Sequence, residues 1–326
     1  MVSTPFSQLV GQTQAIELLI RAVTQKRIAP AYLFVGPPGI GRGLAAENFS
    51  ELLLGSSVDP VSLNLIEDPK LERLRHRIQR RNHPDLLWVE PTYLHQGRRV
   101  TADEAIELGV KRKSLAKIRL EQVREIARFL SRPPLEAERS VVVIQQAETM
   151  AEAAANALLK TLEEPGQASL ILIAPDRSAL LPTLISRCQC IPFSRLHPKQ
   201  MAQVLIQTDN SEILNYPEVL AIAQGSPGQA IASWRRLQTI PAELLAALNS
   251  PPDSLKSALE LARSIPQALD TEAQLWLVDY LQQCYWKSAQ LSQVDSLHRL
   301  EEARRYLLSY VQPRLVWEVT LMGLMG

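Results

Sequence analysis

A chain of 326 residues has room for two or three domains and for a core that needs no metal or disulfide to hold it together. Hydrophobic residues make up 46% of the chain, which excludes disorder as its dominant state. The 35 basic and 34 acidic side chains leave a formal charge of +1, which excludes a polycation that binds nucleic acid through its overall charge.

The cysteine content and the apolar runs indicate the compartment. Three cysteines, Cys188, Cys190 and Cys284, are typical of a reducing environment and not of a secreted disulfide framework. The first residues show no basic segment followed by an apolar one, so no signal peptide is expected. No apolar run approaches the roughly 18 residues of a membrane span. The sequence therefore predicts a cytoplasmic protein with no membrane partner.

Short apolar runs separated by helical patterns indicate the fold class. The runs are continuous, which is typical of strands buried on both faces of a parallel sheet. They cover residues 32–35, 86–89, 141–144, 170–174 and, more weakly, 191–193. Between them, apolar residues recur at helical spacing at Leu120, Val123, Ala127 and Leu130, and residues 150–162 are rich in Ala and Leu. This alternation predicts a three-layer α/β domain over residues 1–195.

A glycine-rich loop with the sequence GPPGIGRG follows the first run. A strand, such a loop and a helix in this order form the context of a phosphate-binding loop. In that loop Gly36, Gly39 and Gly41 let backbone N–H groups converge on a phosphate. The complete pattern continues with Lys for the phosphates and Ser or Thr for Mg²⁺, whereas this chain has Arg42 and Gly43. A tight strand–helix turn that binds nothing is therefore the simpler interpretation.

The charged segment 55–117 carries two basic clusters and the histidines His76, His83 and His95. The clusters allow contacts with DNA phosphates, but no aromatic residues interleave them, so solvated surfaces are the simpler interpretation. The histidines are interpreted as ordinary surface or packing residues. The clustered residues are Arg73, Arg75, Arg77, Arg80 and Arg81, and then Lys111, Arg112, Lys113 and Lys117.

The strand predicted at 141–144 ends in the amides Gln145 and Gln146. A nucleotide hydrolase needs acidic residues here, to hold Mg²⁺ and to align the attacking water. A neutral amide neither offsets the charge of a metal ion nor acts as a general base. Glu148, two residues further on, is a poor substitute for a carboxylate pair. Together with the changes in the glycine-rich loop, these residues predict that the chain is not an ATPase.

Beyond residue 193 the pattern becomes helical. Breaker sequences at 225–228 and 249–252 separate the helical patterns, and long amphipathic helices are predicted at 271–291 and 296–310. The simplest division is a small helical domain over 196–240 and a larger one over 241–326.

Several segments resemble the clamp-loader branch of the AAA+ proteins. They are residues 31–34 (AYLF) leading into 36–39 (GPPG), the helix 156–165 (NALLKTLEEP) and residues 186–188 (SRC). Residues 312–315 (QPRL) are similar to the end of the helical collar in bacterial members. The resemblance extends over nearly the whole chain.

The resemblance implies a RecA-like AAA+ domain with a parallel sheet over 1–195, a helical lid over 196–240 and an all-α collar for oligomerisation over 241–326. It also implies a non-hydrolysing member of a five-subunit ring within the DNA polymerase III holoenzyme. The partners would be delta and the gamma/tau motor subunits, and through the complex a sliding clamp and primed DNA. No cofactor would be required in the chain's own site, since the ATP and Mg²⁺ belong to the neighbouring subunit.

Arg187 matches the position of the family's arginine finger, a guanidinium that stabilises charge during phosphoryl transfer in a neighbour. The simpler alternative is a local ion pair with a carboxylate. Many family members bind zinc through cysteines between the phosphate loop and the second strand, but residues 55–117 contain no cysteine, so no zinc is expected. Gly228 stands where motor subunits place a nucleotide-sensing arginine.

Two other functions remain open at this point. One is an ATP-hydrolysing motor, either a clamp-loader subunit of the gamma/tau type or another AAA+ remodeller of replication or repair. The other is a structural protein that uses the ATPase fold to bind unrelated partners.

Overall fold

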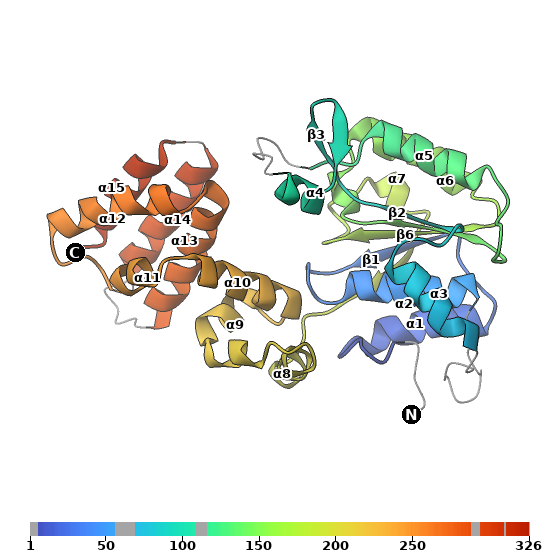
Figure 1. Cartoon of the computed structure of the whole chain (residues 1–326), viewed down its shortest axis with the longest axis horizontal. Coiled ribbons are helices and arrows are strands. Elements are labelled where there is room, and N and C mark those ends of the chain that lie inside the picture. Colours follow the sequence, from blue (N-terminus) through green and yellow to red (C-terminus); the bar gives the residue numbers. More distant parts are fainter. Residues whose placement is uncertain are drawn as a thin grey trace. The chain divides into compact units, whose positions relative to one another are not determined.

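The computed structural model describes residues 6–55, 69–108, 116–248, 250–287, 294–309 and 311–325. The chain forms two compact units, Met1–Arg195 and Leu196–Gly326, each with its own core (Figure 1). Among the described residues, no helix combines the length and the apolar character needed to cross a lipid bilayer.

The first unit is built on a five-stranded parallel sheet in the order β2-β5-β6-β1-β7. Four of the predicted apolar runs lie wholly in this sheet and the fifth, 191–193, overlaps its last strand, which confirms the predicted α/β fold. The strands are β1 (Ala31–Val35), β2 (Leu86–Val89), β5 (Ser140–Ile144), β6 (Ala168–Ala174) and β7 (Gln189–Pro192).

Helices cover both faces of the sheet, because alternate residues of each buried strand point to opposite sides. On one side, Tyr32 and Phe34 of β1 pack with α1 (Thr13–Thr24), α2 (Arg42–Leu54) and α3 (Pro69–Gln79). On the other, Leu33 packs with α5, α6 and α7 (Figure 1). These helices span Leu120–Leu130, Glu152–Glu163 and Pro182–Ile185, and a 3₁₀ turn, η1, covers Ala147–Thr149.

Two details of this unit differ from the expectations. In α5 the buried apolar residues are Val123 and Ile126, whereas Ala127 is exposed, because the larger Ile126 gains more from burial than an alanine does. An antiparallel hairpin of β3 (Tyr93–His95) and β4 (Arg98–Val100), followed by α4 (Ala102–Glu107), lies outside the main sheet. Its strands are only three residues long, too short to show an alternating pattern.

In the second unit the described residues form helices and no strand, as the change in pattern after residue 193 predicts. The predicted helix 271–291 corresponds to α13, whose described part ends at Lys287, and the predicted helix 296–310 to α14. The elements are α8 (Pro198–Gln207), η2 (Ser211–Asn215), α9 (Pro217–Ala223), α10 (Pro227–Thr239), α11 (Ala242–Leu248), α12 (Leu255–Ala268), α13 (Thr271–Lys287), α14 (Val294–Leu308) and α15 (Pro313–Gly323).

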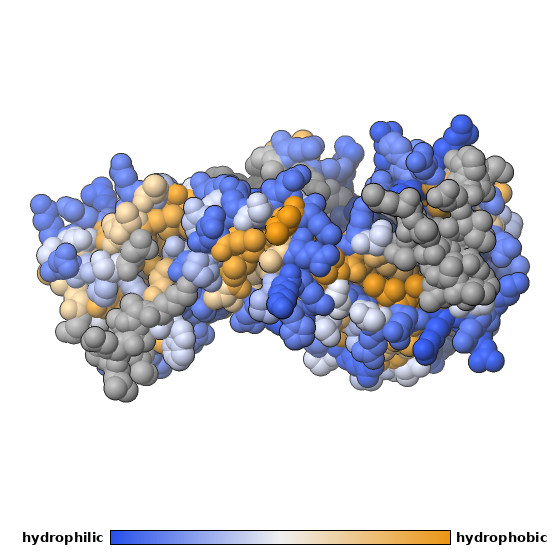
Figure 2. Space-filling view, turned by 90° about the horizontal axis from the view of Figure 1, so that it is seen from below, coloured by the Kyte–Doolittle hydropathy of each residue, from blue (hydrophilic) through white to orange (hydrophobic). Residues whose placement is uncertain are grey.

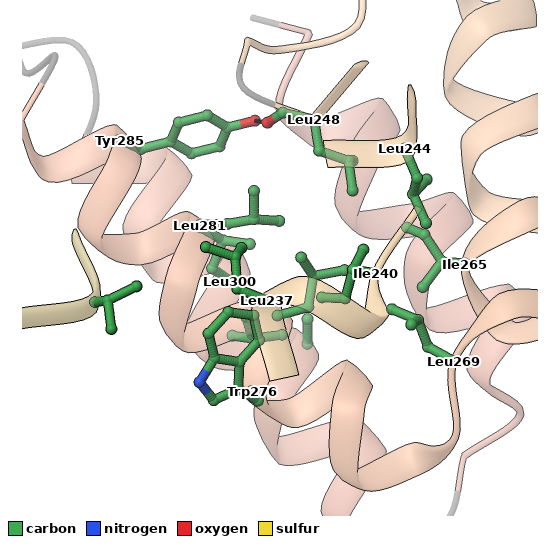
Figure 3. Packing of buried hydrophobic residues seen from close by; sticks show 14 of the residues in the cluster. Leu237, Ile240, Leu244, Leu248, Ile265, Leu269, Trp276, Leu281, Tyr285 and Leu300 are labelled. Atoms are coloured by element: carbon green, nitrogen blue, oxygen red, sulfur yellow. Dashed lines mark hydrogen bonds between the residues drawn. The ribbon is translucent and has the colours of Figure 1, made fainter. Parts of the chain in front are cut away.

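One buried cluster runs through the second unit from Leu196 to Leu324. Figure 3 shows its centre, where the Tyr285 hydroxyl donates a hydrogen bond of 3.1 Å to the carbonyl of Leu248. Residues 196–240 and 241–326 thus share one core, and the division into a lid and a collar stays a prediction. Apolar residues also reach the surface of the molecule (Figure 2), and Leu315 and Val319 of α15 are among the exposed ones.

Candidate functional site

The glycine-rich loop joins β1 to α2 at the carboxyl edge of the parallel sheet. Gly36 has a φ of +155°, and a Cβ at this position would lie 2.4 Å from the carbonyl oxygen of Phe193, so no side chain fits. Gly41, with a φ of +100°, precedes the first residue of α2 and lets the chain turn into the helix. The loop therefore has the backbone course that the sequence predicts for a phosphate loop.

A cavity of ≈ 590 Å³ opens beside this loop. It brings together six of the predicted site residues, from the loop and from the end of β5, whereas Gly36 does not line it. The carboxyl ends of three neighbouring strands, β5, β6 and β1, meet here, because parallel strands all run in the same direction. The lining residues are Pro38, Gly39, Gly41, Arg42, Gly43, Gln145, Gln146, Glu148, Ile173 and Pro175.

Arg42, in the position of the phosphate-binding lysine, is engaged with its own protein. Its Nη1 donates a hydrogen bond to the carbonyl oxygen of Ala174, the last residue of β6. Burial lowers the pKa of the Arg42 guanidinium, and the nearby Glu148 carboxylate opposes that shift. The bond to Ala174 uses one of the five N–H groups of the guanidinium.

Gly43 is not required by the packing around it. A Cβ at this position would meet no atom within 4 Å, although Gly43 lies in the first turn of α2. The surrounding structure would therefore leave room for a side chain at position 43, but the sequence has no Ser or Thr there.

The residues after β5 do not form a metal site. The Gln145 side-chain oxygen accepts a hydrogen bond of 3.1 Å from the indole N–H of Trp88, and Gln146 is exposed. Burial raises the pKa of the Glu148 carboxyl, which favours its neutral form, while the Arg42 charge lowers it. Oε2 of Glu148 is buried without a hydrogen-bond partner. A single carboxyl beside two amides, with no hydroxyl at position 43, does not fit Mg²⁺-ATP, which needs metal-binding carboxylates and a hydroxyl.

Arg187 lies far from this cavity, in the turn between α7 and β7. Its Nη2 donates to Oε1 of Glu163 at 2.8 Å and its Nη1 donates to the carbonyl oxygen of Thr183 at 3.0 Å. The local ion pair that the sequence left as the simpler alternative is therefore present. It joins two exposed side chains, and such pairs stabilise a fold by no more than about 1 kcal/mol.

The register of the sheet places Arg187 and the phosphate loop at opposite edges. Gln189 of β7 pairs with Tyr32 of β1, so Arg187 precedes the amino end of its strand, whereas the loop follows the carboxyl end of β1. Five residues of β1 span roughly 16 Å between these edges. Arg187 therefore cannot reach a phosphate bound at its own chain's loop.

The first basic cluster is largely neutralised within the first unit. Arg75 pairs with Glu51 and Arg77 with Glu136, each through two hydrogen bonds, and Arg81 pairs with Glu90. Arg73 and Arg80 are exposed. In the second cluster, Lys111, Arg112 and Lys113 fall outside the described residues. The structure adds nothing to the interpretation of these clusters as DNA contacts.

The histidines and cysteines do not assemble a metal site among the described residues. Buried His83 accepts a hydrogen bond from the backbone N–H of Asp85. Its pKa is lowered, mainly by burial, which suits the neutral form. Burial also raises the pKa of the Cys188 thiol to about 12, so that this thiol stays protonated.

Glu163 is the functional candidate that sequence reasoning did not single out. It is the last residue of α6, within the segment NALLKTLEEP that carries part of the resemblance. No local pattern links it to Arg187, because the two residues lie 24 positions apart and meet only when α6 and α7 pack together.

Comparisons with known proteins follow the same division of the chain. Residues 11–197 match the family model described as DNA polymerase III, delta subunit, and residues 199–324 match that of the cyanobacterial DNA polymerase III delta prime, C-terminal domain. The chain is 34% identical over 203 residues to DNA polymerase III subunit delta' of Bacillus subtilis (strain 168), an alignment that covers 61% of this chain and 53% of that protein. The alignment with subunit delta' of Pseudomonas aeruginosa is also 34% identical, over 204 residues that cover 61% and 54%.

The matched region thus spans about half the length of these relatives. A solved structure of a DNA polymerase III gamma-subunit-related protein from Thermotoga maritima has the same fold, with a TM-score of 0.54 and 16% identity. That similarity covers 96% of this chain and 98% of the solved one.

Proposed function

Because the chain belongs to the delta-prime family of DNA polymerase III clamp-loader subunits, we propose that it acts in the loader ring without hydrolysing ATP itself. Its role is to scaffold the ring and to present Arg187 to the ATP site of a neighbouring gamma/tau subunit. Delta would be a further partner, and the assembled ring would load a sliding clamp onto primed DNA in the cytoplasm.

The absence of hydrolysis is supported by the groups around the phosphate loop. Arg42 replaces the phosphate-binding lysine, Gly43 offers no hydroxyl, and Gln145 is an amide that bonds to Trp88. An ATP-hydrolysing motor would need acidic residues where β5 ends, and this chain has the amides Gln145 and Gln146 there. The chain's own site would therefore need no cofactor.

The observation that carries the proposal is the place of Arg187. It is exposed, and it lies at the edge of the sheet opposite to its own loop, so a phosphate that it contacts must belong to another chain. A guanidinium that meets the γ-phosphate of a neighbour stabilises the charge of phosphoryl transfer, by about 10³- to 10⁵-fold in rate in well-studied switches. The ATP and Mg²⁺ of this reaction would be bound by the gamma/tau subunit.

The test is a loader reconstituted from this chain, gamma/tau and delta, supplied with clamp and primed DNA. Arg187→Ala is expected to leave assembly on size-exclusion chromatography unchanged and to slow hydrolysis at the adjoining motor site. The DNA-stimulated ATPase should fall by that site's share, and clamp loading should slow. Arg99→Ala, which removes another partly exposed arginine that pairs with a glutamate, is the matched control and should change neither rate.

Two results would contradict the proposal. An unchanged ATPase with Arg187→Ala would remove the arginine finger. ATP turnover by the isolated chain above that of an Arg42→Ala variant would show that it is itself a motor.

A further inference from the structure

The guanidinium of Arg187 is held by two groups from different helices. Glu163 ends α6 and supplies a carboxylate oxygen, and Thr183 lies in α7 and supplies a backbone carbonyl. Leu158 of α6 and Leu184 of α7 are both fully buried in one hydrophobic cluster, which fixes the two helices against each other. The backbones that carry the two acceptors are therefore held in fixed positions.

This arrangement leaves donors of Arg187 unused. A guanidinium has five N–H groups in a rigid planar fork, and the bonds to Glu163 and Thr183 use one on each terminal nitrogen. Three N–H groups remain, and among the described residues no other acceptor bonds to them. A guanidinium with two of its N–H groups in hydrogen bonds can still bind a second anion through the remaining three.

Stability does not explain this pair. The side chains of Arg187 and Glu163 are 38% and 53% exposed, and an ion pair so open to water contributes little to folding. What the contacts do restrict is the conformation of a long side chain with several rotatable bonds. A side chain that is already ordered loses less entropy when it meets its target in a transition state.

We propose that Glu163 is a positioning residue for Arg187. Its carboxylate, together with the carbonyl of Thr183, sets the direction of the fork before the neighbouring subunit presents its phosphate, so that the guanidinium bridges Glu163 and that phosphate. This inference rests on the proposed function above and assigns the group through which the finger is oriented.

The experiment is a double-mutant cycle in the reconstituted loader. It compares the wild type, Glu163→Ala, Arg187→Ala and the double variant, with DNA-stimulated ATPase followed at varied ATP. Glu163→Ala is expected to lower kcat at the adjoining motor site about two- to fivefold, the rate equivalent of one exposed ion pair, with KM for ATP unchanged. In the Arg187→Ala background the same change should have no further effect.

Two further variants separate positioning from a general structural role. Glu163→Gln keeps a carbonyl oxygen that accepts the Arg187 hydrogen bond, so it should restore most of the rate lost in Glu163→Ala. Glu125→Ala breaks the partly exposed pair with Arg99, and it should leave kcat unchanged.

The outcomes distinguish this inference from the proposed function. If Arg187→Ala lowers the ATPase but Glu163→Ala does not, or if the two changes add in the double variant, the positioning role is wrong and the finger stands. If Arg187→Ala has no effect, the proposed function itself fails. A fall in kcat with Glu163→Ala that vanishes in the Arg187→Ala background supports both.

Discussion

The buried side chain of Asp85 anchors a neighbouring backbone segment in the first unit. Its carboxylate accepts hydrogen bonds from the N–H groups of Leu135, Glu136 and Ala137, at 2.6, 2.8 and 2.8 Å. Asp85 is only 2% exposed. Burial by itself would raise the pKa of this carboxyl, but the three N–H donors and His83 outweigh it, and the pKa is lowered. The ionised form therefore fastens the segment before β5 to the start of β2.

We expect Asp85→Ala to lower the free energy of unfolding by at least about 2 kcal/mol at pH 7, because it leaves buried N–H donors without an acceptor. The lowered pKa means that the carboxylate stabilises the fold above the pKa of an unfolded aspartate, about 3.9, and loses this effect as pH falls through the folded value. The difference between variant and wild type should therefore shrink below about pH 4. Urea unfolding between pH 3 and 8 measures it, and a difference that is independent of pH would contradict the role of the charge.

At the scale of the element, the connection from β1 into the first turn of α2 contains two glycines whose surroundings differ. One has no room for a side chain, and the other has ample room. Gly36 lies against the backbone of Phe193, which no local adjustment of a side chain can move away. Gly43 faces open space within a helix, where glycine costs conformational entropy and has no steric benefit. The backbone course of a phosphate loop thus requires glycine at Gly36 and, through its φ of +100°, favours it at Gly41, whereas position 43 has no such requirement.

Positions 36 and 43 form a matched pair of substitutions. Gly36→Ala is expected to destabilise the protein by more than about 2 kcal/mol, since the Cβ clashes with a backbone oxygen and the φ of +155° is strained for alanine. Gly43→Ala is expected to stabilise it by up to about 1 kcal/mol. Thermal unfolding of both variants measures the two changes in stability. Equal losses of stability at the two positions would show that packing also requires glycine at position 43.

At the scale of the whole molecule, each of the two units has a core of its own. The first unit has a buried cluster on each face of its sheet. In the second unit a single cluster includes the fully buried Trp317, whose indole N–H donates to Gln274 at 2.9 Å. Domains of about 130 to 195 residues are large enough to fold alone.

We therefore expect separately expressed fragments 1–195 and 196–326 each to unfold cooperatively. Circular dichroism and thermal melts of the fragments measure this, and Trp317→Ala in the second fragment should cost about 3–5 kcal/mol as an internal check. A fragment with secondary structure but without a cooperative transition would show that its core needs the rest of the chain.

Much of the site was predictable from sequence because its signals are local. Glycines after an apolar run, Arg42 and Gly43 in place of Lys and Ser or Thr, and amides after the strand at 141–144 all describe neighbouring residues. The carboxyl edge of a parallel sheet then brings these segments together wherever they lie in the chain. The short hairpin β3–β4 and the buried face of α5 were missed or misassigned, because the first is too short for a pattern and the second depends on what packs against it.

The sequence alone determined the fold class, the family resemblance and the loss of the hydrolytic groups, since each depends on the identity and spacing of nearby residues. Only the tertiary structure decided which partners the side chains take. It placed Arg187 beside Glu163 and Thr183, joined Arg42 to the carbonyl of Ala174, and left one oxygen of Glu148 without a partner. The physical reason is that these contacts join segments distant in the chain, and their energies depend on the burial and exact separation that packing alone sets.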